Sequence, residues 1–169
     1  LFKQYFKDGF QKETLDDWSK YGDPWSRRNI HDAVIVEFSD YKVKAVPYDM
    51  PIIGYGAKHV SNLRLWQAEP IEEFDFSLFD DGKYNKAVTD KNKAEDISRV
   101  LYPNDNTLYG KLLRLRQQYF FCSASLQDIL KKYKENHTDF NELSDFVTIQ
   151  LNDTHPVISI PELIRLLGN

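Results

Sequence analysis

The 169-residue sequence contains one cysteine, Cys122, so it can form neither an intrachain disulfide nor a zinc site built from several cysteines. So little cysteine fits a reducing compartment, and we expect a cytoplasmic protein. No apolar run is long enough to predict a membrane span. Neither sign of charge dominates, because 22 basic and 26 acidic residues leave a net charge of −4. This balance argues against a protein that binds duplex nucleic acid.

Several catalytic motifs are absent as well. Gly54 and Gly56 match a glycine-rich phosphate loop only in part, since a third glycine and a following helix are missing. There is no G-x-S-x-G nucleophile elbow. His31, His59 and His137 lack the spacing of metal ligands. We therefore predict no metal site.

Aromatic residues are abundant, at 14% of the chain, and hydrophobic residues make up 41%, which is enough for one core. The aromatic content suits extensive stacking or subunit contacts, although a tyrosine-rich core explains it equally well. The sequence begins at Leu1 without an initiator methionine and ends directly after an apolar helical run. We expect residues 1–169 to be a single partial domain, a fragment of something longer.

The first half of the chain is predicted to be mostly β. Asp8 and Gly9 separate two weakly alternating runs, which is a hairpin signal. Alternating or β-branched apolar residues indicate three further strands, at residues 33–38, 41–46 and 60–66. Two prolines and two glycines predict a loop between the last two strands: Pro47, Pro51, Gly54 and Gly56.

The second half is predicted to be mostly helical. Apolar residues recur every three or four positions at 84–101, with a polar gap at 89–93, and more clearly at 111–134. A polar connector at 135–144 precedes an apolar, β-branched run at 147–151, which has the length of a buried strand. Ser159 and Glu162 have the spacing of a capping box, so a last helix is expected to run to about residue 167.

The predicted strand at 147–151 ends in a polar cluster that contains Asp153, Thr154 and His155. In open α/β sheets, ligands bind just outside the carboxyl ends of strands. Asp153 and His155 are therefore a candidate site. The alternative, which spacing alone favours, is that Asp153 and Thr154 only satisfy backbone groups in a turn.

A second polar group extends this candidate. Arg114 lies on the predicted long helix close to the loop of Asn104, Asp105 and Asn106, and could face the same cleft. Asn, Asp, His and Arg side chains together are typical of a site that reads sugar hydroxyls by directional hydrogen bonds. The alternatives are a surface charge for Arg114 and a hydrogen-bonded turn for the loop.

Longer motifs, in order along essentially the whole chain, closely resemble the α-glucan (glycogen/maltodextrin) phosphorylases. They are DW at 17–18, YGDPW at 21–25, VPYD at 46–49, GY at 54–55, NLRLW at 62–66, ISRVLYPNDN at 97–106, LRLRQQYFF at 113–121, QLNDTHP at 150–156 and IPEL at 160–163. Several of these runs are long and specific.

The resemblance implies a GT-B fold, in which two Rossmann-like domains face each other across a cleft. This α/β chain would be an interior part of the amino-terminal domain, with a β-rich first half and a helix-rich second half. Such enzymes cleave α-1,4-glucan with inorganic phosphate to give glucose 1-phosphate, and pyridoxal phosphate supplies its phosphate group to the acid–base chemistry. The lysine that bonds this cofactor would lie outside the chain, so the fragment alone is expected to be inactive.

The resemblance also suggests roles for the candidate residues. Asp153 and His155 would line the sugar side of the cleft, and Arg114 would brace that pair. Asp105 and Asn106 would belong to a mobile loop that gates the site, with Asn106 as the contact to a sugar hydroxyl. The helix from about residue 84 to residue 100 is similar to the family's subunit-contact helix, which implies a homodimer.

One feature departs from the family pattern, and one further expectation concerns the stability of the chain. Lys131 and Lys132 replace an arginine pair that contacts an activating nucleotide in the animal enzymes, so we predict an enzyme that does not need AMP. We also expect residues 119–121 of the long helix to lack part of their cover and to promote aggregation. The alternative function is a free-standing, non-catalytic α/β module that binds carbohydrate or a partner.

Overall fold

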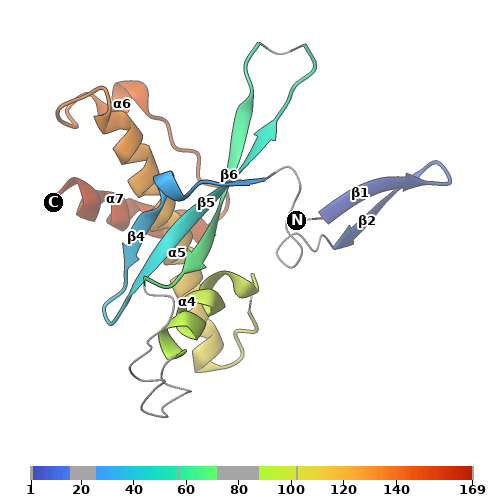
Figure 1. The fold of residues 1–169 in the computed structure, drawn as a ribbon, viewed down its shortest axis with the longest axis horizontal. Coiled ribbons are helices and arrows are strands. Elements are labelled where there is room, and N and C mark those ends of the chain that lie inside the picture. The colour runs from blue at the N-terminus through green and yellow to red at the C-terminus, as the bar shows by residue number, and fades with distance from the viewer. Residues whose placement is uncertain (1, 16–25, 57, 72–87, 102, 169) are drawn as a thin grey trace. The chain divides into compact units, whose positions relative to one another are not determined.

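The computed structural model describes the chain apart from a few segments, namely residues 1, 16–25, 57, 72–87, 102 and 169 (Figure 1). The described chain is α/β and forms two compact units. The first unit comprises Leu1–Arg27 and Asp49–Arg64, and the second comprises Arg28–Tyr48 and Leu65–Asn169. The candidate residues all belong to the second unit, so the fold of that unit determines how they are placed.

The first unit contains the predicted hairpin. Strands β1 (Phe2–Lys7) and β2 (Phe10–Leu15) pair antiparallel. Asp8 and Gly9 connect them with φ angles of 54° and 79°. Two successive positive φ angles are what a two-residue turn needs to match the twist of its flanking strands, and Asp-Gly adopts them readily. The hairpin prediction is confirmed.

A four-stranded sheet follows, with the order β3-β5-β4 and with β6 paired to β5. The strands are β3 (Arg27–Arg28), β4 (Val34–Glu37), β5 (Lys42–Ile52) and β6 (Ser61–Glu69). A short 3-10 turn, η1 (Ile30–Asp32), precedes β4. β4 and β5 run antiparallel, from Val34 opposite Ala45 to Glu37 opposite Lys42. The three strands predicted from the sequence are therefore present.

The loop predicted from four residues is shorter than expected. Pro47 and Pro51 lie inside β5, so the prediction that they begin the loop is wrong, whereas Gly54 and Gly56 do lie between β5 and β6. A proline removes one backbone donor but keeps its carbonyl acceptor. Here the carbonyl of Pro47 accepts a hydrogen bond from the amide of Asn29 at 2.9 Å, so Pro47 still contributes to backbone pairing.

Both long predicted helices are present. Helix α4 spans Thr89–Arg99, and residues 84–87 of the prediction lie outside the described residues. Helix α5 spans Leu108–Lys134 and begins three residues before the predicted start. The reason is a cap: the hydroxyl of Thr107 accepts a hydrogen bond from the amide of Gly110 at 3.1 Å. In the described part of the chain, no helix is long and apolar enough to cross a membrane.

The core lies between the sheet and these two helices. Buried residues from three strands meet buried residues of α4 and α5: Val36, Val43, Ala45, Trp66, Ala68, Ala94, Ile97, Phe120 and Ala124. Two hydrogen bonds also join the layers. The indole of Trp66 donates to the hydroxyl of Ser125, and the amide of Ala68 donates to the hydroxyl of Ser98, both at 3.0 Å. The sheet therefore fixes the position of α5, which carries half of the candidate site.

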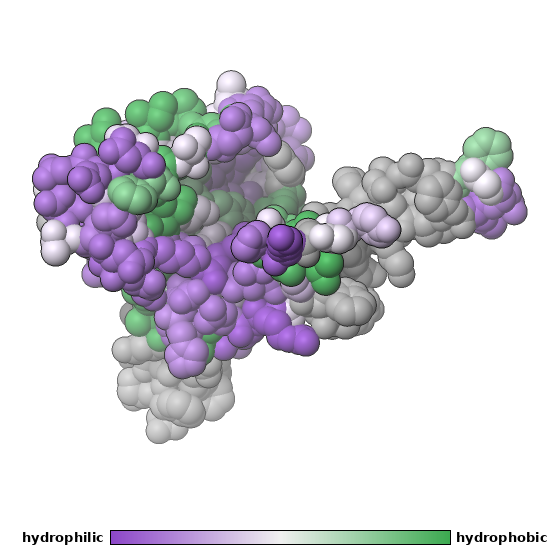
Figure 2. Space-filling view, turned by 90° about the horizontal axis from the view of Figure 1, so that it is seen from above, coloured by the Kyte–Doolittle hydropathy of each residue, from purple (hydrophilic) through white to green (hydrophobic). Residues whose placement is uncertain are grey.

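The prediction that residues 119–121 lack part of their cover is wrong for Phe120, which is fully buried. Tyr119 and Phe121 pack against the core but are only partly buried, and the expected aggregation stays a prediction. The exposed apolar residues of α5 lie instead in its first turns, where Leu108 is 74% and Tyr109 is 65% exposed. Hydrophobic side chains are also visible among hydrophilic ones on the surface of the described part (Figure 2).

The predicted strand at residues 147–151 is not formed. This segment has no regular structure and is mostly exposed, although Val147 has extended backbone angles. β-branched residues favour an extended chain, but a strand also needs a hydrogen-bonded neighbour. None of the described residues pairs with the segment. Asp153 and His155 therefore do not follow a sheet edge within the described residues.

The 3-10 turn and the last helix that follow this segment pack against α5. The short helix α6 (Leu143–Phe146) begins inside the predicted connector, and the 3-10 turn η2 (His155–Ile158) leads directly into α7 (Ser159–Leu167). The last helix ends as predicted, but the capping box is wrong. The cap position is Ile158, which makes no side-chain cap hydrogen bond, and Ser159 is already the first residue of the helix. Ser159 and Glu162 are buried, while Ile160 and Ile164 are 55% and 69% exposed.

Candidate functional site

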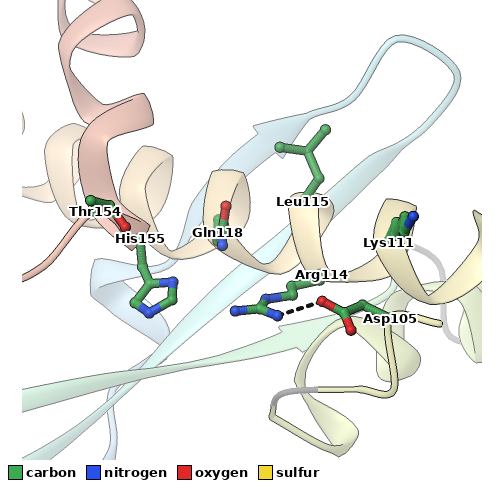
Figure 3. Close-up of a pocket in the computed structure, with 7 residues that line it drawn as sticks. All are labelled: Asp105, Lys111, Arg114, Leu115, Gln118, Thr154 and His155. Carbon is green, nitrogen blue, oxygen red and sulfur yellow. Dashed lines mark hydrogen bonds and ion pairs between the residues drawn. The ribbon is translucent and has the colours of Figure 1, made fainter.

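A surface pocket of about 370 Å³ lies between the first half of α5 and the start of η2 (Figure 3). Its lining residues come from three segments: Asp105, Lys111, Arg114, Leu115, Gln118, Thr154 and His155. Four of them lie on α5 at steps of three or four residues, so the helical repeat places them on one face. This face joins two polar segments that are some fifty residues apart in the sequence.

The loop before α5 is attached to the helix by polar contacts. Arg114 Nη1 donates to Asp105 Oδ2 at 2.6 Å, and both side chains are partly exposed. Asn104 Oδ1 accepts a hydrogen bond from the amide of Asn106 at 2.9 Å. The predicted hydrogen-bonded turn is therefore present. Its middle residue is Asp105, which supplies the carboxylate of the site.

Asp153 and His155 lie together, as predicted. His155 Nε2 is 3.2 Å from Asp153 Oδ2, and their side chains are 37% and 65% exposed. Asp153 has a φ angle of 63°, in the left-handed region, which aspartate tolerates better than most residues. Its Oδ1 accepts a hydrogen bond from the amide of Thr154 at 2.6 Å. This bond and the nearby imidazole hold the pKa of Asp153 below its usual value.

Three of the five predicted site residues line the pocket: Asp105, Arg114 and His155. Asn106 and Asp153 lie next to lining residues in the sequence but are not among them. Figure 3 shows the imidazole of His155 and the guanidinium of Arg114 on the same side of α5. The ion pair of Arg114 is with the loop carboxylate of Asp105, and its bracing of the Asp153–His155 pair stays a prediction.

Sequence reasoning missed four lining residues, namely Lys111, Leu115, Gln118 and Thr154. Lys111 and Gln118 lie three residues before and four residues after Arg114, so the helical repeat was a signal that could have found them. Thr154 lies inside the polar cluster that was already singled out. No group of three or more His, Cys, Asp or Glu side chains is placed to hold a metal ion among the described residues.

The position of His155 depends on a buried network between α5 and α7. Glu162 is 3% exposed, and its carboxylate accepts hydrogen bonds from the hydroxyl of Ser123 at 2.6 Å and from that of Tyr119 at 3.4 Å. Arg165 adds donors at 2.8 and 2.9 Å. Because η2 leads directly into α7, these contacts also fix the turn that carries His155.

The charge state of this network follows from its hydrogen bonds. Burial alone would raise the pKa of Glu162, but the hydrogen bonds from Arg165 and Ser123 outweigh it and hold this pKa below its usual value. The same contact raises the pKa of Arg165. Burial raises the pKa of the neighbouring Cys122 thiol, so this cysteine is not an activated nucleophile. The network therefore supports the site and does not react.

The pocket offers directional donors and acceptors in an open setting. An ammonium, a guanidinium, an amide and an imidazole face it together with one carboxylate and one hydroxyl, and a single leucine is its apolar wall. Such groups suit a ligand that carries many hydroxyls, since each hydroxyl both donates and accepts. The arrangement could bind and orient such a ligand, and the hydroxyl of Thr154 donates to the exposed carboxylate of Asp153 at 3.3 Å.

Comparison with known proteins extends over the whole chain. Residues 1–169 match the family model of carbohydrate phosphorylases. The chain is 44% identical to glycogen phosphorylase of Saccharomyces cerevisiae and 40% identical to that of Synechocystis sp., each over 99% of its length. It is 42% identical to the muscle form of human glycogen phosphorylase, again over 99% of its length. It spans 21% of the yeast protein and 22% of each of the other two.

Proposed function

This chain belongs to the carbohydrate phosphorylase family, and we propose that it is part of an enzyme that cleaves α-1,4-glucan with inorganic phosphate to give glucose 1-phosphate. The observation that carries the proposal is the match of 99% of the chain to relatives named glycogen phosphorylase. The chain spans about a fifth of the length of these curated relatives, so the activity belongs to a longer parent enzyme.

In this proposal the pocket beside α5 is the sugar side of the catalytic cleft. Asp153 and His155 line the side that receives the glucosyl unit, 3.2 Å apart, and Arg114 braces this pair. Asp105 orients Arg114 through their ion pair, and Asn106 contacts a sugar hydroxyl. The chain supplies binding and orientation, and it contributes no covalent catalytic residue.

The proposed fold of the parent enzyme is GT-B, with residues 1–169 inside its amino-terminal Rossmann-like domain. The parent is proposed to be a homodimer in which α4 contacts the partner subunit. This role rests on the resemblance to the family. Glu95 forms ion pairs with Lys91 and Arg99 on the exposed part of the helix, so these charged residues suit the polar rim of an interface rather than its apolar core.

Pyridoxal phosphate is the proposed cofactor of the parent, and when bound it would supply its phosphate group to acid–base chemistry. The pocket residues do not fit this group well, because the guanidinium of Arg114 pairs with Asp105, whose carboxylate would repel a phosphate group. We place the cofactor lysine and the basic residues that bind phosphate outside these 169 residues. The single cysteine agrees with a cytoplasmic enzyme.

A direct assay tests the proposed function. The parent enzyme and the isolated 169-residue chain are each incubated with maltodextrin and inorganic phosphate, and glucose 1-phosphate is measured. We expect product from the parent and none from the isolated chain. A reading frame that stops near residue 169, together with glucan binding but no phosphorolysis, would instead support the carbohydrate-binding module.

We predict that AMP does not activate the parent enzyme. Lys131 and Lys132 stand where an arginine pair would be needed, and an ammonium lacks the planar fork that holds phosphate in two hydrogen bonds. Both ammonium groups also have other partners: Lys132 pairs with Asp128 at 2.9 Å, and Lys131 donates to the carbonyl of His31 at 3.2 Å. Initial rates measured across an AMP titration should stay flat, and several-fold activation would contradict the prediction.

A further inference from the structure

The loop of residues 104–106 rests directly on the first turn of α5, at Gly110. A Cβ atom built on Gly110 would lie 1.8 Å from the carbonyl oxygen of Asn104, 2.9 Å from its carbonyl carbon and 3.3 Å from the Cα atom of Asp105. All three atoms are backbone atoms, so no side-chain rotation can relieve the contact. Any larger residue at position 110 must push the loop away from the helix.

The choice of glycine is unfavourable for the helix itself. Gly110 lies in the first turn of α5, where glycine is a weaker helix former than alanine. Its φ angle is not in the left-handed region, so the backbone conformation does not require glycine. The close approach of the loop is therefore the structural feature that glycine permits at this position.

Three polar contacts fix the loop around the same turn. The amide of Gly110 donates to Thr107, the carboxylate of Asp105 pairs with Arg114, and Asn104 accepts from the amide of Asn106. The first contact caps the helix, the second joins the loop to the helix one turn beyond Gly110, and the third lies within the loop. These contacts hold the loop against α5. The absence of a side chain at Gly110 determines how closely the loop backbone approaches the helix.

We propose that Gly110 is a positioning residue for the substrate site. Because it has no side chain, residues 104–106 sit against α5, and this sets where Asp105 enters the pocket and where Asn106 is presented. The last step rests on the proposed function, since it takes Asn106 as the contact to the sugar. The seating of the loop itself rests only on the contacts described above.

The test uses Gly110→Ala in the parent enzyme, with Gly168→Ala as the matched control. At Gly168 the nearest atom to an added Cβ is the carbonyl oxygen of Ile164 at 3.4 Å, which is ordinary contact. Hydrogen exchange of residues 103–107 should be faster in Gly110→Ala and unchanged in the control. A displacement of about 1 Å can cost on the order of 100-fold in rate, so kcat/KM for maltodextrin should fall by about that factor only in Gly110→Ala.

A double-mutant cycle separates positioning from a merely structural effect. If Gly110 acts through Asn106, Gly110→Ala should lower kcat/KM far less in an Asn106→Ala background than in the wild type. Equal losses in both backgrounds would overturn the assignment. Faster hydrogen exchange of the loop together with a wild-type kcat/KM would show that the loop packs against α5 as inferred. It would also show that Asn106 does not contact the sugar.

Unchanged exchange of residues 103–107 in Gly110→Ala would overturn the seating itself. A second variant covers the case in which Gly110→Ala does not fold. Asn104→Ala removes the side-chain acceptor of the loop without adding atoms to the helix. It should speed exchange of the same residues and lower kcat/KM in the same direction, and wild-type behaviour in both measurements would contradict the proposal.

Discussion

Replacing His155 with alanine in the parent enzyme is expected to lower kcat/KM for phosphorolysis of maltodextrin by about 10- to 100-fold. The imidazole lines the pocket and is held by Asp153, so its loss removes a positioned hydrogen-bonding group. A hydrogen bond that involves a charged group contributes about 1.5–3 kcal/mol, and each 1.4 kcal/mol is roughly tenfold. Initial rates at varied maltodextrin and phosphate concentrations measure the effect.

His137→Ala is the matched control for this substitution. The ring of His137 stacks on Tyr133, with 4.0 Å between the ring centroids, and it does not line the pocket. This variant should keep wild-type kcat/KM. His155→Ala should keep the fold, because the side chain of His155 is 37% exposed and fills no part of the core. Equal losses of activity in the two variants would argue against a role for His155 in binding sugar.

Glu162→Ala is expected to lower the free energy of unfolding by about 2–4 kcal/mol, because it removes the buried acceptor that joins α5 to α7. The hydroxyl of Ser123, which is fully buried, would lose its carboxylate partner. Urea denaturation followed by circular dichroism measures the change. Glu135→Gln, at the exposed end of α5, is the control and should stay within about 0.5 kcal/mol of the wild type.

The effect of Glu162 should depend on pH. Its pKa in the folded chain lies below the ordinary value of 4.5, so the ionised carboxylate stabilises the fold. This stabilisation is fully present above the unfolded pKa and is lost as the pH falls through the folded pKa. The difference in unfolding free energy between wild type and Glu162→Gln should therefore be constant near neutral pH and shrink below about pH 4.5. A difference that stays constant down to pH 3 would contradict this charge assignment.

The sequence correctly predicted the elements that depend on neighbouring residues in the chain. The hairpin turn follows from the backbone preferences of Asp8 and Gly9, and α5 follows from apolar residues that recur every three or four positions. The segment at 147–151 has the composition of a strand, yet pairing depends on a neighbour that its own sequence does not specify. The capping-box spacing of Ser159 and Glu162 was misleading for a similar reason, since α5 buries both side chains.

The candidate site was predicted in part. Asp105, Arg114 and His155 carry polar groups in suggestive places, and the structure brings all three to one pocket. Gly110 gave no signal in the sequence, because its importance comes from the approach of a backbone oxygen that only the tertiary structure reveals. Polar and charged side chains that can act in a site are recognisable in a sequence. A position that needs glycine because another segment packs against its backbone is not.

The left-handed backbone at Asp153 has a consequence for mutagenesis. A φ angle of 63° is strained for most side chains, and alanine there would change the turn and the charge at once. Asparagine tolerates the same conformation while removing only the charge, and glycine relaxes the turn while removing both charge and side chain. Substitution of Asp153 by alanine would therefore mix two effects. Comparing Asp153→Asn with Asp153→Gly separates the electrostatic contribution of Asp153 from its conformational contribution.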